Sequence, residues 1–225
     1  MEDFRKITLI RSHSERRIPM ANTSIPSYDF LLRGFYSSNR YARKSYNRVS
    51  ISSPELASVD AEALKKISEN LRKLDYDNTE TSNGEIIFNN AKAFVETYNN
   101  PITSSDACDS DKLNRMMKKL KNYVKENKSS LEEIGITYTS SGKLTLDEDD
   151  LKSSSLKKVK NLFSQSGEFT STIADFSKKV FRISKTVITE AAREKNKDND
   201  TSANPFSNLV QTVNQMDANG IDYLA

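Results

Sequence analysis

An apolar stripe with a heptad period constrains the fold of this chain more than any other sequence feature. Its six members follow one another at alternating steps of four and three residues. Because an α-helix turns once in about 3.6 residues, the stripe lies along one side of a helix, and another helix must cover it. We therefore predict a long helix over about 167–195 that packs within the chain, with packing against a second copy as the alternative. The members of this seam are Phe169, Ile173, Phe176, Val180, Ile183 and Val187.

Three stretches upstream repeat the helical spacing of apolar residues. The first predicts a helix over 58–75 with Ser58 as its N-cap, and the second predicts a helix that ends at Pro101. The third predicts an amphipathic helix that continues to about residue 125. We expect the seam to pack against the apolar side of this third helix and against the face around Phe94. That apolar side consists of Leu113, Met116, Leu120 and Val124.

One segment has the period of a β-strand instead. Apolar residues alternate with polar ones at Ile134 and Ile136, and again at Leu144 and Leu146, on either side of a turn that contains Gly142. This pattern predicts a β-hairpin at about 134–146, in which Gly142 adopts a positive φ. The chain is thus predicted to be mainly α, an elongated helical bundle or coiled coil with one short hairpin.

The two ends of the chain differ in composition from its middle. Residues 1–56 contain three of the five prolines and no sustained apolar period, so we predict an irregular basic arm. Residues 57–195 form the predicted helical domain with its hairpin. Residues 196–225 are predicted to be a polar linker followed by an amphipathic C-terminal helix.

The basic character of the arm raises the question of a nucleic-acid partner. Residues 1–50 hold ten Lys or Arg against four Asp or Glu, with aromatic residues between the cations. This composition suits RNA or an acidic surface, because cations meet phosphates and rings stack on bases. The cations never gather on one helical face, however, so we favour a solvated leader and do not expect nucleic acid as a partner.

The sequence offers little for catalysis or for metal binding. It has one cysteine, Cys108, and one histidine, His13, and none of the phosphate-loop, dinucleotide, zinc-protease or serine-hydrolase motifs. The acidic run 147–150 lacks the alternating ligands and the glycine of an EF-hand loop, and it suits the first turn of a helix. We predict no catalytic residue, no metal, no cofactor and no small-molecule substrate. No apolar run is long enough to span a membrane, and no signal-peptide core is present.

Several short motifs occur in an order that resembles a known family. They are Ala93-Phe-Val-Glu-Thr-Tyr-Asn99, Ile134-Gly-Ile136, Gly142-Lys-Leu-Thr-Leu-Asp147 and Val159-Lys-Asn-Leu-Phe163. Together with the seam they resemble the C-terminal region of flagellar hook-associated protein 2, the cap of the bacterial flagellar filament, over roughly residues 85–195. The residues that carry the resemblance are Phe94, Val95, Tyr98, Asn99, Ile134, Gly135, Ile136, Leu144, Leu146, Asp147, Leu162 and Phe163.

The resemblance implies a non-enzymatic structural protein. In the family this region belongs to a helical stalk that contacts neighbouring subunits, and the protein leaves the cell by flagellar type III export without a cleaved signal. The inserted β-rich domains and the N-terminal helix of cap proteins have no recognisable counterpart here, so we expect a reduced or divergent member. The expected partners are copies of the chain or flagellar components. The alternatives are a cytoplasmic helical interaction module, such as an export chaperone or regulator, and a nucleic-acid binder that uses the basic arm.

Overall fold

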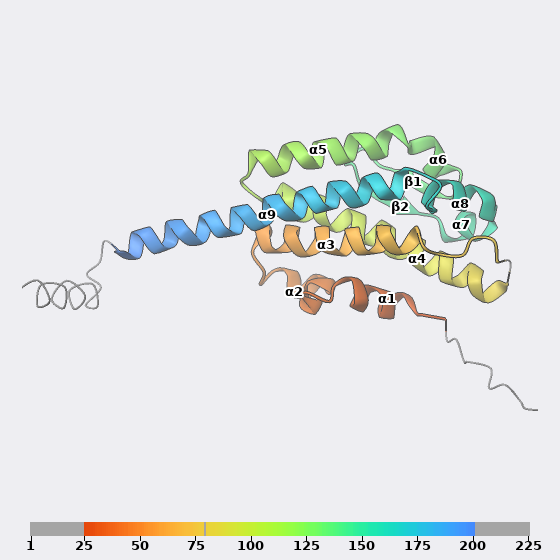
Figure 1. The fold of residues 1–225 in the computed structure, drawn as a ribbon, viewed down its shortest axis with the longest axis horizontal. Coiled ribbons are helices and arrows are strands. Elements are labelled where there is room, and N and C mark those ends of the chain that lie inside the picture. The colour runs from red at the N-terminus through yellow and green to blue at the C-terminus, as the bar shows by residue number, and fades with distance from the viewer. Residues whose placement is uncertain (1–24, 79, 201–225) are drawn as a thin grey trace, which may run out of the picture.

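The computed structural model describes residues 25–78 and 80–200 and shows a helical bundle with one β-hairpin (Figure 1). The prediction of a mainly α fold with one short hairpin is confirmed for this part of the chain. The elements in chain order are α1 (Tyr28–Phe35), the 3₁₀ helix η1 (Arg40–Arg43), α2 (Ser45–Arg48), α3 (Ser53–Leu71), α4 (Thr81–Asp106), α5 (Asp111–Glu126), α6 (Lys128–Glu132), β1 (Ile136–Tyr138), β2 (Leu144–Leu146), α7 (Glu148–Ser153), α8 (Leu156–Phe163) and α9 (Phe169–Asp200).

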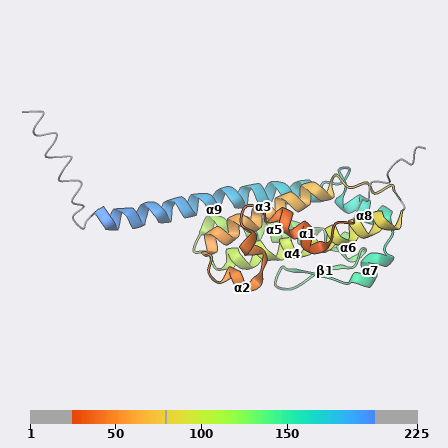
Figure 2. The ribbon, with the colours of Figure 1, turned by 90° about the horizontal axis from the view of Figure 1, so that it is seen from below.

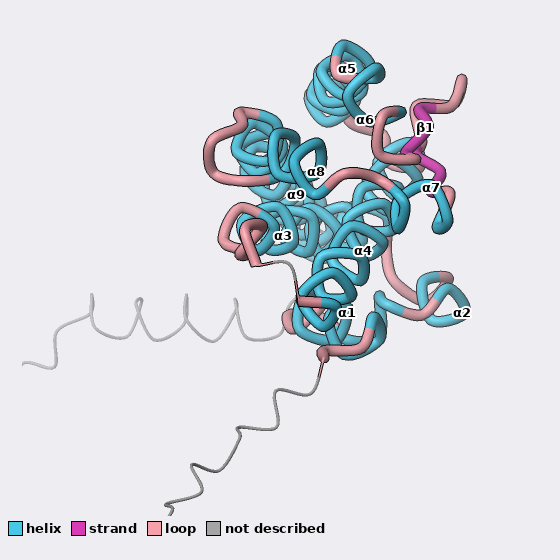
Figure 3. The backbone as a smooth tube through the Cα atoms, turned by 90° about the vertical axis from the view of Figure 1, so that its right-hand side faces the viewer, coloured by secondary structure: helices cyan, strands magenta, loops and turns pink. Residues whose placement is uncertain are grey.

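Four long helices form the body of the molecule. Helices α3, α4, α5 and α9 run alternately up and down, and α9 lies between α3 and α5 when the bundle is viewed from its end (Figures 1 and 3). The most extensive packing joins α3 and α9. Both helices bury small residues, such as Ala57 and Ala61 in α3 and Ala174 and Ser177 in α9, so the two backbones can approach closely.

The hairpin has the predicted position and turn. Strands β1 and β2 pair antiparallel, with Ile136 opposite Leu146 and Tyr138 opposite Leu144. Gly142 has a φ of 82°, and its N–H donates a hydrogen bond of 3.0 Å to the carbonyl of Thr139. The prediction of a positive φ at this glycine is therefore confirmed.

The prediction of an irregular arm over 1–56 is wrong for the stretch from α1 to α2, which is helical, and residues 1–24 lie outside the described residues. Helix α1 buries Leu32 and Phe35, and Tyr36 follows it into the core. These elements span only eight, four and four residues, too few to show a sustained helical period in the sequence. Packing against α3 and α4 stabilises them instead.

Several helix boundaries also differ from the predicted ones. Helix α3 begins before Ser58, because Ser52 and Glu55 form a capping box around its first turn. Helix α4 continues through Pro101 to Asp106. A proline inside a helix costs about 3 kcal/mol, and burial of Pro101 together with Ile102 offsets that cost.

Two further expectations need correction. The polar linker predicted from residue 196 begins too early, because α9 continues as a helix to Asp200. The predicted C-terminal helix lies outside the described residues. On α5 the buried methionine is Met117 and not Met116, which is only partly buried.

We predict that Gly142→Val destabilises the fold by about 1 kcal/mol or more, because a β-branched residue is strained at positive φ. A Cβ at this position would also lie 2.9 Å from the side chain of Lys121. Gly84→Ala is the matched control, since Gly84 lies within α4 and a Cβ there meets nothing within 4 Å. This control should gain up to about 1 kcal/mol from helix propensity. Urea denaturation of both variants measures the two effects, and a Gly142→Val chain as stable as the wild type would contradict the strained turn.

Candidate functional site

The residues of the family-like motifs, which are far apart in the sequence, meet at one junction between α4 and the hairpin. The side-chain amide of Asn99 donates to the carbonyl of Leu144 and accepts from its N–H, both at 2.8 Å. The hydroxyl of Tyr98 donates to the carbonyl of Gly142 at 3.0 Å. The Asn99 amide thus acts like a short piece of neighbouring strand and satisfies the free edge of β2.

An aromatic cluster extends this junction toward α9. The ring of Phe94 lies edge-on to Phe163 and to Phe169, with centroid separations of 5.5 and 5.9 Å. Such edge-to-face pairs add about 0.5–1.5 kcal/mol to the burial of each ring. The cluster therefore joins α4, α8 and the start of α9.

The other motif residues surround the same junction. Asp147 caps α7 by accepting hydrogen bonds of 3.0 Å from the N–H groups of Asp149 and Asp150. Gly135 has a φ of 75°, and a Cβ there would meet the Cβ of Asp150 at 2.7 Å. All these residues contribute to the packing of the fold around the junction. Those that are also buried are Val95, Ile134, Ile136 and Leu162, whereas Leu146 is partly buried.

The seam of α9 is only partly covered. Phe169, Ile173 and Val180 are buried, whereas Phe176, Ile183 and Val187 are partly exposed. The expected contact with α5 exists, because Phe169 and Phe176 both lie about 6 Å from the ring of Tyr123. The main partner of α9, however, is α3.

Sequence reasoning missed the α3 contact because polar residues contribute to it. Thr170, Ser177 and Ser184 are buried on α9 and fall between the members of the seam. A search for apolar periodicity passes over serine and threonine. These three residues are spaced seven apart, about two helical turns, and this spacing is the sequence signal that could have indicated a second buried face of α9.

The distal part of the seam borders an open groove. The groove has a volume of about 380 Å³ and lies between the start of α5 and the middle of α9, where Ile183 and Val187 contribute apolar surface. Beyond it, α9 projects past the end of the bundle, and residues 189–196 are exposed (Figures 1 and 2). Within the described residues, the distal end of the seam at Ile183 and Val187 is therefore only partly covered.

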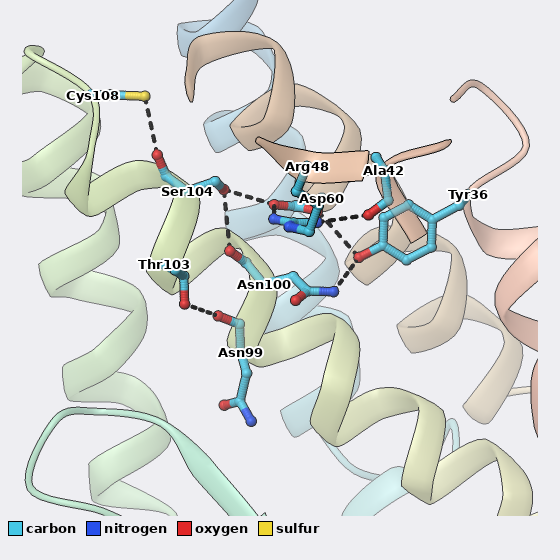
Figure 4. Close-up of polar contacts among 9 residues, drawn as sticks. All are labelled: Tyr36, Ala42, Arg48, Asp60, Asn99, Asn100, Thr103, Ser104 and Cys108. Atoms are coloured by element: carbon cyan, nitrogen blue, oxygen red, sulfur yellow. Dashed lines mark hydrogen bonds and ion pairs between the residues drawn. The ribbon is translucent and has the colours of Figure 1, made fainter. Parts of the chain in front are cut away.

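A buried polar network attaches the N-terminal helices to the bundle (Figure 4). Asp60 of α3 is fully buried and accepts hydrogen bonds from the guanidinium of Arg48 at 2.6 and 2.8 Å. The hydroxyls of Ser104 and Tyr36 donate to the same carboxylate at 2.7 and 3.2 Å. Burial, and then the nearby negative charge of Asp60, raises the pKa of Tyr36 well above its usual range, so the phenol stays protonated and donates.

The outer surface of these N-terminal helices is unusual. The large apolar side chains that are most exposed among the described residues all belong to this segment and are between 65% and 91% exposed. Nearby, the carboxylate of Asp29 is paired with Arg33, Arg43 and Lys44, which leaves positive charge in excess. Exposed rings beside cations are typical of an interaction surface. The exposed residues are Phe30, Tyr41, Tyr46 and Val49.

The described residues include Cys108 but hold no cluster of metal-binding side chains. No group of three or more His, Cys, Asp or Glu is placed there to hold a metal ion. Cys108 is buried, its Sγ lies 3.3 Å from the carbonyl of Ser104, and burial raises its pKa to about 11. His13 lies outside the described residues. Within 25–78 and 80–200, no helix is both long enough and apolar enough to cross a membrane.

Comparison with known proteins identifies no relative of this chain. A scan against protein-family models, a search of curated proteins and a search of solved structures each give no match.

We predict that Asp60→Asn lowers the free energy of unfolding by about 3 kcal/mol, because the largely buried guanidinium of Arg48 loses its fully buried counter-charge. Asp77→Asn is the matched control: Asp77 also pairs with a cation, Lys160, but its side chain is 78% exposed, so the loss should stay below about 1 kcal/mol. Urea denaturation compares the two variants.

Limited proteolysis tests whether the same network attaches the N-terminal helices to the bundle. The wild-type chain should resist cleavage within 28–50, and Asp60→Asn should be cut there first. Equal stability and equal cleavage patterns for the two variants would show that this network does not anchor the segment.

Proposed function

We propose that this chain is a non-enzymatic structural or assembly protein that packs through its helices against other subunits, in the manner of the stalk of the flagellar filament cap. The observation that carries the proposal is the distal seam of α9, which the described residues cover only in part. Its distal residues Ile183 and Val187 border an open groove, and the helix then projects from the bundle (Figure 1). A partly covered heptad seam is a surface that a further helix can cover.

The motif junction supports the same proposal. Motifs that resemble the stalk region are held together by the side chains of Tyr98 and Asn99, which bond to the hairpin. These hydrogen bonds make the motifs parts of one packed unit, which is what supports treating them together. Under this proposal the partners are copies of the chain or flagellar components, and the protein is exported through the flagellar type III apparatus.

We expect two substitutions on the seam to separate folding from association. Val180→Asp should cost several kcal/mol of folding stability, because it places a carboxylate on a buried interface. Val187→Asp should change the stability by less than about 1 kcal/mol, because Val187 is only partly buried. It should nevertheless weaken subunit association by about tenfold or more, measured by sedimentation over a wide dilution series. Thr189→Asp, an exposed position two residues farther along α9, is the control and should associate like the wild type.

Localisation tests the export part of the proposal. In a host with flagella the protein should reach the culture supernatant only when the export apparatus is intact. A wild-type chain that stays monomeric at every concentration, alone and with flagellar cap and filament proteins, would contradict the assembly role. Retention inside the cell in both strains would instead favour the cytoplasmic chaperone or regulator.

A second candidate function rests on the exposed rings of the N-terminal helices. Tyr41 and Tyr46 are exposed beside Arg40, Arg43 and Lys44, a combination that suits single-stranded nucleic acid. If this function holds, binding to an RNA oligonucleotide should weaken steeply with salt, and Tyr41→Ala with Tyr46→Ala should lower the affinity at constant salt. Binding that is weak and insensitive to both changes would exclude it.

A further inference from the structure

A second groove lies at the end of the bundle where α4 begins and where α7 and α8 pack against it. It has a volume of about 370 Å³. Its floor is apolar and is made by Ile87, Leu151 and Val159, which are nearly buried, while Phe88 and Leu156 are partly exposed and border it. A groove of this composition suits a short apolar segment.

The rim of this groove carries more negative than positive charge. Glu80 and Glu85 line it from the start of α4, and both are exposed. The cation on the rim is Lys152, whose ammonium lies 4.6 Å from the centre of the Phe88 ring. The groove therefore favours an occupant that combines apolar side chains with positive charge.

The N-terminal part of the chain arrives beside the groove. The side-chain amide of Asn89 donates a hydrogen bond of 3.3 Å to the carbonyl of Pro26, and Asn89 is the neighbour of Phe88. Figures 1 and 2 show the start of α1 at the same end of the bundle as the start of α4 and as α7 and α8. The far end of α9, from which the C-terminal residues continue, lies at the opposite end.

The two ends of the sequence differ in composition, and this difference favours residues 4–11 over residues 201–225 as the occupant of the groove. Residues 4–11 combine four apolar side chains with three cations. Residues 201–225 contain two Asp and no Lys or Arg, so their charge would be repelled by the acidic rim. The apolar residues of 4–11 are Phe4, Ile7, Leu9 and Ile10, and its cations are Arg5, Lys6 and Arg11.

We propose that residues 4–11 dock in the groove between α4, α7 and α8 of their own chain. The intervening residues 12–24 can span about 40 Å when extended, which is ample for a groove beside the point of attachment. A tether of this length gives an effective concentration in the millimolar range, so a modest intrinsic affinity is enough to fill the groove. The docked segment covers Phe88 and Leu156 and places its cations near Glu80 and Glu85.

A tryptophan in the groove tests this proposal in the full chain. The protein has no tryptophan, so Phe88→Trp provides a single reporter. In this background we expect Ile7→Asp combined with Leu9→Asp to shift the emission to longer wavelength. Quenching by acrylamide should increase about twofold or more, because the ring loses its cover. Ser12→Asp with Ser14→Asp adds the same charge outside the segment and should leave the emission unchanged.

Charge reversal on the rim provides an independent variant. Glu85→Lys should expose the reporter as the segment variant does, whereas Glu194→Lys on the projecting part of α9 should not. Circular dichroism of each variant confirms that the bundle is intact. The Phe88→Trp chain and its four variants should all give results that do not depend on concentration, because the docking is intramolecular.

A titration that needs no reporter completes the test. A synthetic peptide of residues 1–14 should bind the Ile7→Asp, Leu9→Asp chain about tenfold or more tightly than the wild-type chain, in which the tethered segment competes. Equal emission and quenching in all variants, or equal peptide binding to both chains, would overturn the proposal. A reporter signal that changes with dilution would assign the groove to a second copy and would equally overturn docking within the chain.

Discussion

The antiparallel packing of α3 against α9 is the contact on which the rest of this structure depends. It joins two helices separated by nearly one hundred residues of chain, and it is the most extensive helix pairing among the described residues. The elements between them, α4 to α8, follow one another through short loops. The pairing of α3 with α9 is therefore a contact of long sequence separation, which brings α9 beside α3 after the whole of α4 to α8. Small buried residues such as Ala57 and Ser177 decide how closely the two helices approach.

Two sets of polar contacts select this arrangement from other ways of packing the same apolar surface. The amide of Asn99 bonds to β2 and fixes the hairpin on α4. The carboxylate of Asp60 collects donors from α2, α4 and the residue after α1, and it fixes the N-terminal helices on α3. Burying Asp60 with fewer partners would be costly, so the alternatives that break this network are disfavoured. Apolar burial drives the collapse, and these contacts specify its geometry.

Three apolar surfaces that the described residues leave at least partly uncovered lie at different places on the bundle. The distal seam around Val187 is partly exposed, and the rings of Phe30, Tyr41 and Tyr46 on the N-terminal helices are exposed. The groove beside Phe88 has an occupant of fitting composition within the same chain. Cys108, the cysteine of the chain, offers no further surface, because it is buried and the raised pKa keeps its thiol protonated at neutral pH.

The sequence by itself determined the fold class, the hairpin with its positive φ at Gly142 and the seam of α9, because each depends on a local period or a single backbone requirement. It also placed Asn99 and Leu144 in short motifs, but not their contact, which depends on how α4 meets the hairpin. Only the tertiary structure decided that α1 to α2 are helical, that α4 continues through Pro101 and that α3 is the main partner of α9. The physical reason is the same in each case: burial between elements distant in the sequence offsets the weak or unfavourable local preference of short helices, of an internal proline and of serines such as Ser177.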